Sequence, residues 1–185
     1  MELLVAMALL TMIVLGIMNI EIFCKHAFTG TDRKTKVSNE ATYIIEHMSK
    51  FIGKAIGSAG DFPVTDSNIP GCDKVLRAGT EVTPTGVKDT GDVEIAYCYE
   101  STDHTLDYFP HYRTWPDTIN TDDDTKERMS RNIVTFDTIF GPNMNYVDIT
   151  IEACWNATVS CGSVDNPRVK MQTRVVLPSV SINTP

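Results

Sequence analysis

Carboxylates are the first candidates for chemistry in this chain, and they are densest in one short acidic segment. Asn120-Thr-Asp-Asp-Asp-Thr125 places Asp122, Asp123 and Asp124 in succession. Hard cations such as Ca²⁺ take several carboxylate and carbonyl oxygens, so this segment is a candidate calcium site. It lacks the spacing and the glycine of an EF-hand loop, and an ordinary solvated loop is the alternative. We expect no other metal and no cofactor.

The five cysteines are the second candidates, because thiols form disulfides or bind metals. Cys72, Cys98, Cys154 and Cys161 permit three pairings. We favour Cys154 with Cys161, which would close a short turn between two strands, and Cys72 with Cys98. Zinc is the rival, but the chain has no CxxC pair and its histidines lie apart from the thiols. Disulfides indicate a chain exported from the cytoplasm, and Cys24 is expected to be a small buried residue.

Catalytic groups are the third possibility. His104 and His111 lie in the segment Asp103-His-Thr-Leu-Asp-Tyr-Phe-Pro-His-Tyr112, which is more typical of a packed surface loop than of a catalytic dyad. The sequence offers no nucleophile beside an acid and base pair, no glycine-rich phosphate loop and no metal motif. We therefore expect no enzyme activity and no small-molecule substrate.

Charge bears on the class of partner. The chain holds 24 acidic residues against 16 lysines and arginines, a net charge of −8. An excess of negative charge disfavours broad binding to phosphate backbones. We expect no nucleic acid partner.

Glu2 is a lone carboxylate ahead of a long apolar run. From Leu3 to Ile20 only Thr11 and Asn19 have polar side chains, and as a helix this run spans roughly the 30 Å of a bilayer's hydrocarbon core. A carboxylate at that edge is costly unless a partner pairs with it. A secretory signal peptide is one alternative, but the run is long and no small-x-small cleavage site follows. A plain membrane anchor is the other.

A second helical pattern follows, apolar on one face only. Its apolar residues recur at spacings of three and four, which predicts a helix that packs one stripe on a core. Gly30 could loosen or break the helix between the two halves, and Gly53, Gly57 and Gly60 mark its expected end. The apolar stripe consists of Val37, Ala41, Ile44, Ile45, Met48, Phe51, Ile52, Ala55 and Ile56.

The remainder of the chain, 61–185, is predicted to be β-rich with long loops. Alternation in 92–99, 146–155 and 168–177 indicates strands with one wet face, as in an antiparallel sheet. Laid on the amphipathic half of the helix, about 32–57, such a sheet closes one core. The expected fold class is α+β, with residues 1–28 as an apolar half-helix and 29–185 as a globular head. The inward positions are Val93, Ile95, Tyr97, Tyr99, Val147, Ile149, Ile151, Ala153, Val169, Met171, Thr173 and Val175.

The opening segment Glu2-Leu-Leu-Val-Ala-Met-Ala-Leu-Leu10 resembles the N-terminus of type IV pilins and of the pseudopilins of type II secretion. In that family a basic leader is cut after a glycine, and an aromatic residue and a few others precede the Glu-Leu-Leu-Val sequence. We therefore expect the leader, the cleavage site and the first mature residues, with their modified amine, to be missing ahead of Glu2. The resemblance is strong over the apolar helix and only architectural beyond it.

The resemblance implies a lollipop-shaped subunit whose spine helix assembles with spines of identical or related subunits. Glu2 would pair with a neighbour's positive amine and set the axial register. The subunit would sit in a bacterial inner membrane before assembly and afterwards in an extracellular pilus or a periplasmic pseudopilus. The assembly residues so implied are Glu2, Leu3, Leu4, Val5, Met7, Leu10, Ile13, Val14 and Ile17.

Three functions remain open at this point. The first is a structural subunit of a helical filament serving adhesion, motility or secretion, with a minor pilin or pseudopilin favoured over a major pilin. The second is a membrane-tethered, non-polymerising binding module that recognises a ligand through the loops from His104 to Asp124. The third, an exported hydrolase, lacks a defensible set of catalytic residues.

Overall fold

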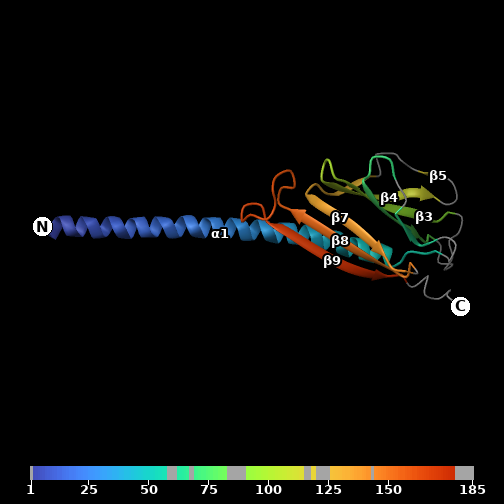
Figure 1. The fold of residues 1–185 in the computed structure, drawn as a ribbon, viewed down its shortest axis with the longest axis horizontal. Coiled ribbons are helices and arrows are strands. Elements are labelled where there is room, and N and C mark those ends of the chain that lie inside the picture. Colours follow the sequence, from blue (N-terminus) through green and yellow to red (C-terminus); the bar gives the residue numbers. More distant parts are fainter. Residues whose placement is uncertain are drawn as a thin grey trace.

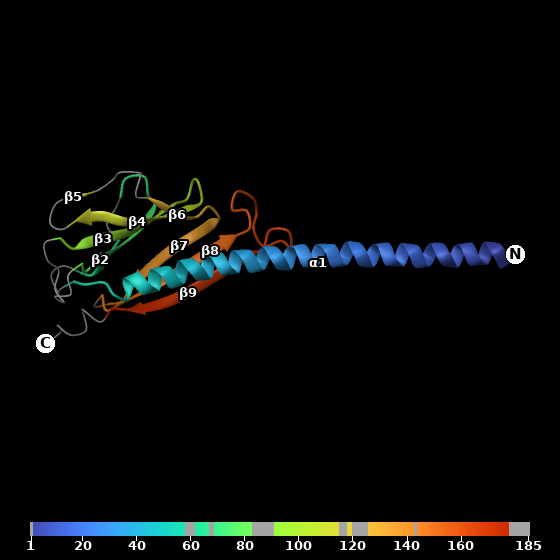
Figure 2. The same cartoon turned by 180° about the vertical axis from the view of Figure 1, so that it is seen from behind.

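The fold is α+β: one long N-terminal helix packs on antiparallel β-sheet, in a pilin-like layout (Figure 1). The structure, a computed structural model, describes residues 2–57, 62–66, 69–82, 91–114, 118–119, 126–142 and 144–177. The helix projects from the head as a straight stem, with the N-terminus at the far end from the strands (Figures 1 and 2).

The helix α1 runs without interruption from Glu2 to Ile52, 51 residues, which is a length of about 75 Å. The expected break at Gly30 is therefore wrong. One helical glycine costs only about 1 kcal/mol relative to alanine. The hydroxyl groups of three nearby threonines bond to backbone carbonyls of the helix itself. Thr29, Thr31 and Thr35 each donate a hydrogen bond to the carbonyl four residues earlier.

The second half of α1 is amphipathic, as predicted from its spacing. Val37, Ala41, Ile44, Met48 and Ile52 are buried, with at most 2% of each exposed, and they face the sheets. Past Ile52 the chain turns: the Gly53 N–H still bonds to the Ser49 carbonyl, whereas the Lys54 N–H bonds three residues back, to Phe51. The helix thus ends at the first of the three predicted glycines.

The strands form two antiparallel sheets rather than one. The larger sheet contains β1 (Val64–Thr65), β2 (Lys74–Thr80), β3 (Val93–Glu100), β4 (Thr105–Thr114) and β5 (Thr118–Ile119) in that order, with β6 (Glu127–Ser130) also paired to β4. The smaller sheet has the order β7 (Ile133–Phe140), β8 (Tyr146–Cys154) and β9 (Arg168–Val176). The amphipathic half of α1 lies along β8 and β9 (Figure 2).

The smaller sheet follows the predicted alternation. In β8, Val147, Ile149, Ile151 and Ala153 are fully buried. On its other face Glu152 accepts a hydrogen bond from Arg168 and pairs with Lys170, both from β9. These cross-strand charges satisfy the outward carboxylate and fix the register of β8 with β9.

The larger sheet departs from the expected pattern in β3, which is buried on both faces. Ile95, Tyr97 and Tyr99 point into the main core. Ala96, on the opposite face, packs in a second cluster with Ile69, Val75 and Tyr112. The expected wet face is therefore covered by the segment that precedes β2, which the Cys72–Cys98 disulfide ties to this strand.

The segment 103–112 was expected to be a surface loop, and that expectation is wrong. Most of it belongs to β4, where Leu106 and Tyr108 are buried in the core. Its pairing with β3 shifts register between Glu94 and Ala96, which stand opposite Arg113 and Phe109. Pro110 falls in this irregular stretch, where a residue without an N–H is tolerated.

Candidate functional site

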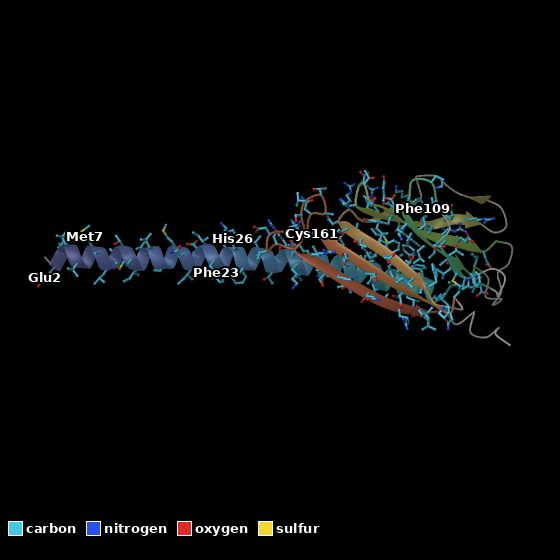
Figure 3. All side chains as sticks on the ribbon, in the orientation of Figure 1. Glu2, Met7, Phe23, His26, Phe109 and Cys161 are labelled. Carbon is cyan, nitrogen blue, oxygen red and sulfur yellow. A yellow bond between two sulfur atoms is a disulfide. The ribbon has the colours of Figure 1, made fainter. Side chains whose placement is uncertain are left out.

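The stem, residues 2–29 of α1, is apolar and almost entirely uncovered. Its large side chains are exposed on every side, from 76% at Phe28 to 47% at Val14 (Figure 3). Its length and composition would allow this helix to cross a membrane, a property it shares with signal sequences. So large an apolar surface calls for lipid or for other protein to cover it.

Polar side chains in the stem are satisfied by the helix itself. The Thr11 hydroxyl donates to the Ala8 carbonyl at 2.8 Å, and the Asn19 amide donates to the Leu15 carbonyl at 2.9 Å. In an apolar environment Thr11 therefore leaves no hydrogen-bond donor unsatisfied, and at Asn19 one N–H of the side-chain amide is satisfied within the helix. Glu2 differs, because it stands in the first helical turn, where its charge is favourable to the helix dipole.

The structure brings the predicted assembly residues together along one helix and leaves all of them exposed. Leu3, Met7, Leu10, Val14 and Ile17 follow a spacing of four and three, and so form one stripe on the stem. Ile13 borders this stripe, because it is three residues from Leu10 and four from Ile17. Leu4 and Val5 lie further round the helix. A stripe of this spacing suits close packing of two helices at a shallow angle.

The stem meets the head at Gly30, which is buried although its helical neighbours are exposed. A Cβ on Gly30 would lie 2.7 Å from Cγ1 of Val164 and 2.9 Å from the Val164 carbonyl oxygen. Only glycine lets the loop between β8 and β9 approach the helix this closely. The loop thus rests on the stem at the point where a helix break was expected.

Hydrogen bonds and a disulfide within the loop between β8 and β9 hold its conformation. The buried Asn166 side chain donates to the carbonyls of Asn156 and Ser160 and accepts from the Asn156 N–H. The disulfide between Cys154 and Cys161 closes its first half. The structure thus contains the two predicted disulfides, and this one holds the loop that touches the stem.

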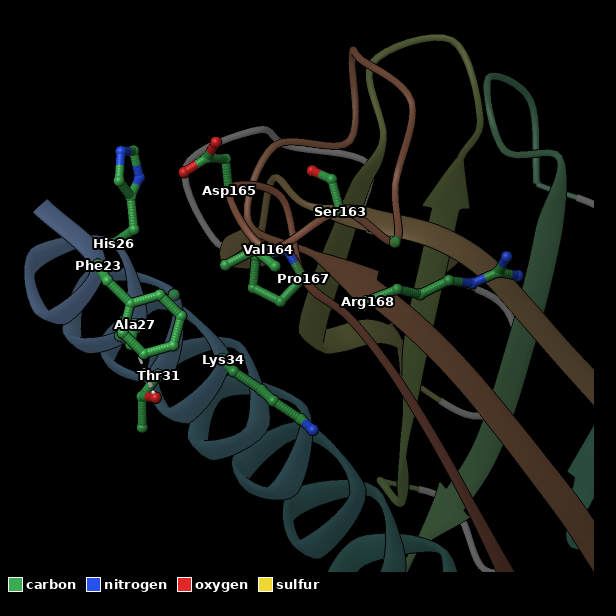
Figure 4. Close-up of a pocket in the computed structure, with 12 residues that line it drawn as sticks. Phe23, His26, Ala27, Thr31, Lys34, Ser163, Val164, Asp165, Pro167 and Arg168 are labelled. Carbon is green, nitrogen blue, oxygen red and sulfur yellow. Dashed lines mark hydrogen bonds between the residues drawn. The ribbon is translucent and has the colours of Figure 1, made fainter. Parts of the chain in front are cut away.

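A groove of about 770 Å³, here called the junction groove, opens between the stem and this loop (Figure 4). Its floor and walls combine apolar side chains with cationic ones. From the stem it is lined by Phe23, His26, Ala27, Gly30, Thr31 and Lys34. From the loop and β9 it is lined by Gly162, Ser163, Val164, Asp165, Pro167 and Arg168.

Ion pairs occupy some of the charges around the junction groove. Arg33 donates a 2.5 Å hydrogen bond to the Asp165 carbonyl and lies 3.7 Å from its carboxylate. Lys36 pairs with Asp32 at 2.8 Å. Within the described residues, Lys25 and Lys34 have no ion pair. The indole of Trp155 stacks under Arg33, 5.7 Å from its guanidinium carbon.

A half-buried histidine, His47, lies among aromatic rings at the edge of the core of the head. The His47 ring nitrogen is 3.0 Å from the Tyr97 hydroxyl, and the ring centre is 4.7 Å from those of Phe51 and Tyr108. Burial lowers the pKa of His47, against a smaller opposing effect of Glu127. Burial likewise raises the pKa of Tyr108 to about 12. His47 meets Tyr97 and Tyr108 edge to face, so the cluster is a packing feature.

Asp107 is the most deeply buried acidic side chain in an ion-pair cluster of the head. Burial raises its pKa, but hydrogen bonds from Arg128 and Lys126 together hold the pKa below its ordinary value. The contacts measure 2.8 Å to Arg128 Nε and 2.8 Å to Lys126 Nζ. These ion pairs connect β4 to Arg128 of β6 and to Lys126, which directly precedes β6.

The other candidate sites do not form in the described part of the chain. His104 directly precedes β4 and His111 lies within that strand, roughly 20 Å further along, so they make no dyad. The calcium candidates Asp122, Asp123 and Asp124 lie outside the described residues. Among the residues described, no group of three or more His, Cys, Asp or Glu side chains could hold a metal ion.

Two features of the site were not predicted correctly from the sequence. Cys24 is exposed on the stem rather than buried. The junction groove was missed because its two walls lie far apart in the sequence. The isolated Gly30 within a helical pattern was the one available signal, since such a glycine often marks a close approach.

Comparison with family models, with curated proteins and with solved structures gave no match.

Proposed function

We propose that the chain is a structural subunit of a helical filament of the pilus or pseudopilus kind, assembled through its stem. The observation that carries this proposal is the stem itself: a continuous helix whose apolar side chains are exposed all round. Packing of identical stems at a fixed rise and rotation covers this surface. Because the packing does not close on itself, it gives a fibre.

Two stable environments follow for the same surface. Lipid covers the stem before assembly, and neighbouring stems cover it afterwards. The exchange leaves the hydrophobic contribution nearly unchanged, so van der Waals packing and polar pairs decide its direction. Thr11 and Asn19 do not impede the exchange, because their main hydrogen bonds lie within the helix.

Glu2 supplies the polar pair in this proposal. A carboxylate in an apolar bundle is expensive unless a positive group binds it, and a paired one gains a charge-assisted hydrogen bond. The pair forms only at one axial offset between neighbouring stems. Glu2 therefore selects the register of the filament, and the apolar stripe supplies the packing.

The test compares two carboxylates of the same stem. Glu2→Ala and Glu21→Ala are expressed in the full chain, membrane insertion is checked by resistance to alkaline extraction, and fibres are counted by electron microscopy. We expect both variants to insert, Glu2→Ala to give few or no fibres, and Glu21→Ala to polymerise as the wild type does.

The outcomes separate the alternatives. Normal fibre yield from Glu2→Ala would remove the register role. A wild-type chain that stays in membranes and forms no fibres under conditions of high expression would favour a tethered binding module instead.

A further inference from the structure

We propose that the junction groove binds the phosphate headgroup of an anionic phospholipid while the stem is in a membrane. The proposal rests on the membrane-inserted state that the proposed function assumes before assembly. It adds a specific lipid partner and a place on the chain where that lipid is held.

The position of the groove along the helix matches the level of the headgroups. From Leu3 to Phe23 the helix rises by about 30 Å, which is the thickness of the hydrocarbon core. Phe23 would thus lie at the edge of that core. Lys34 is about 16 Å further along, at the head side of the groove, and its side chain points away from Phe23 (Figure 4). His26, which also lines the groove, lies only about 5 Å beyond Phe23 along the helix.

The charges at the groove fit an anion. Lys34 lines it, is exposed and has no ion pair among the described residues. His26 and Arg168 line it as well, although the Arg168 guanidinium is already paired with Glu152. The one carboxylate on the rim, Asp165, lies 3.7 Å from Arg33, which offsets its charge. A net charge of −8 therefore does not prevent a cationic site at this end of the head.

Other acidic groups at this level face away from the groove. Glu21 and Asp32 differ from Phe23 by two and nine residues, which places both on roughly the opposite side of the helix. Asp32 is also paired with Lys36 at 2.8 Å. Repulsion of an anionic headgroup from these carboxylates is thus weaker on the groove side than elsewhere on the stem.

Apolar side chains in the groove favour a lipid over a free anion. Phe23 is 74% exposed and Val164 is 65% exposed, and they line the same groove from the stem and from the loop (Figure 4). A free phosphate would leave both uncovered. The glycerol and upper acyl carbons of a phospholipid would cover them while the phosphate faces Lys34.

Native mass spectrometry of the detergent-solubilised full chain tests the proposal. Phosphatidylglycerol, phosphatidylcholine with the same acyl chains, and glycerol phosphate are each titrated onto the protein. Three variants are compared with the wild type. Lys34→Gln removes the unpaired charge, Ala27→Trp fills the groove without changing charge, and Lys54→Gln removes an exposed lysine beyond the far end of α1.

The expected result is a preference for phosphatidylglycerol over phosphatidylcholine that depends on the groove. Lys34→Gln should weaken phosphatidylglycerol binding about fivefold, the ratio that corresponds to about 1 kcal/mol for one basic residue at an anionic surface. Ala27→Trp should weaken it at least as much. Lys54→Gln should bind as the wild type does.

Three results would overturn the proposal. Equal binding of the two lipids, or wild-type preference in both groove variants, would show that the groove holds no anionic lipid. Glycerol phosphate binding as tightly as the lipid would assign the site to a free anion. A wild-type dimer that Ala27→Trp abolishes would assign the groove to a second copy of the chain. Since these readouts use unpolymerised protein, they are independent of fibre yield.

Discussion

Gly30 and Val164 lie so close together that the space between helix and loop has no room for a methyl group: a Cβ on Gly30 would be 2.7 Å from Val164 Cγ1. The two residues are far apart in the sequence, and their contact is what joins the stem to the β8–β9 loop. The junction groove, on the stem side of the head, exists because this contact sets the separation of its two walls.

Gly30→Ala should destabilise the head. Alanine favours the helix by about 1 kcal/mol, but overpacking against Val164 costs about 1 to 3 kcal/mol, and one of the clashing atoms is a backbone oxygen. We expect a net loss of about 1 kcal/mol, measured as a lower melting temperature by near-ultraviolet circular dichroism of the full chain in detergent.

Thr35→Ala is the control for this substitution, because Thr35 is exposed on the same helix. It should leave the melting temperature unchanged or raise it slightly. If Gly30→Ala were to raise the melting temperature by as much as Thr35→Ala does, the close contact with Val164 would not restrain the loop in solution.

A truncated chain beginning at Lys25 should be a soluble, cooperatively folding monomer. It keeps the buried stripe of α1 from Val37 to Ile52 and both sheets, and it lacks most of the exposed apolar surface. Light scattering should give the monomer mass, and thermal melting should show a single transition. An aggregated or non-cooperative product would mean that the removed residues belong to the folding core.

The helical half of the head was predictable because its signal is local. Val37, Ala41, Ile44, Met48 and Ile52 recur at the helical period, and that period alone determines which side is buried. The alternation in β8 is equally local. The disulfide between Cys154 and Cys161 could be predicted because the two cysteines are only 7 residues apart. A turn at the end of a strand brings such near neighbours together.

The features that escaped prediction depend on distant partners. Pro110 and His111 make β4 look like a loop, and only the register shift opposite β3 shows how the strand accommodates them. The buried outer face of β3 depends on Ile69 and Tyr112, which come from elsewhere in the chain. The contact of Gly30 with Val164 joins two distant segments, and no periodicity within one segment indicates it. The junction groove therefore could not be predicted from sequence patterns.

The two disulfides should differ in what they contribute to stability. The chain-entropy account predicts about 3.5 kcal/mol for the pair Cys72–Cys98 and about 2.5 kcal/mol for Cys154–Cys161, since their separations are 26 and 7 residues. Replacing each pair by serines should therefore lower the free energy of unfolding more for Cys72–Cys98. Denaturant titration of both double variants measures the difference.

The shorter disulfide should matter more for the junction groove. Its loss frees the first half of the loop that carries Val164, whereas the loss of Cys72–Cys98 leaves that loop intact. Phosphatidylglycerol preference should fall in the Cys154/Cys161 double variant and persist in the other. A greater loss of phosphatidylglycerol preference in the Cys72/Cys98 double variant would show that lipid binding does not depend on this loop.

Acidification should destabilise the head in two separate pH ranges. Burial lowers the pKa of His47, so the unfolded chain takes up the proton more readily than the folded one. The stability that neutral His47 contributes is complete above about pH 6.5, the pKa of an unperturbed histidine, and is lost as the pH falls toward the folded pKa. Asp107 and Asp148 have lowered pKa values, so their contribution is lost only below their ordinary pKa of 3.8.

His47→Gln distinguishes these ranges. The variant should lose less stability than the wild type on acidification through the upper range, and should parallel the wild type in the lower one. His111→Gln is the matched control, because His111 is exposed on β4 and should leave both ranges unchanged. The free energy of unfolding, measured by denaturant titration at a series of pH values, gives both slopes. Parallel profiles for the wild type and His47→Gln in the upper range would show that the ring beside Tyr97 stays accessible to protons in the folded head.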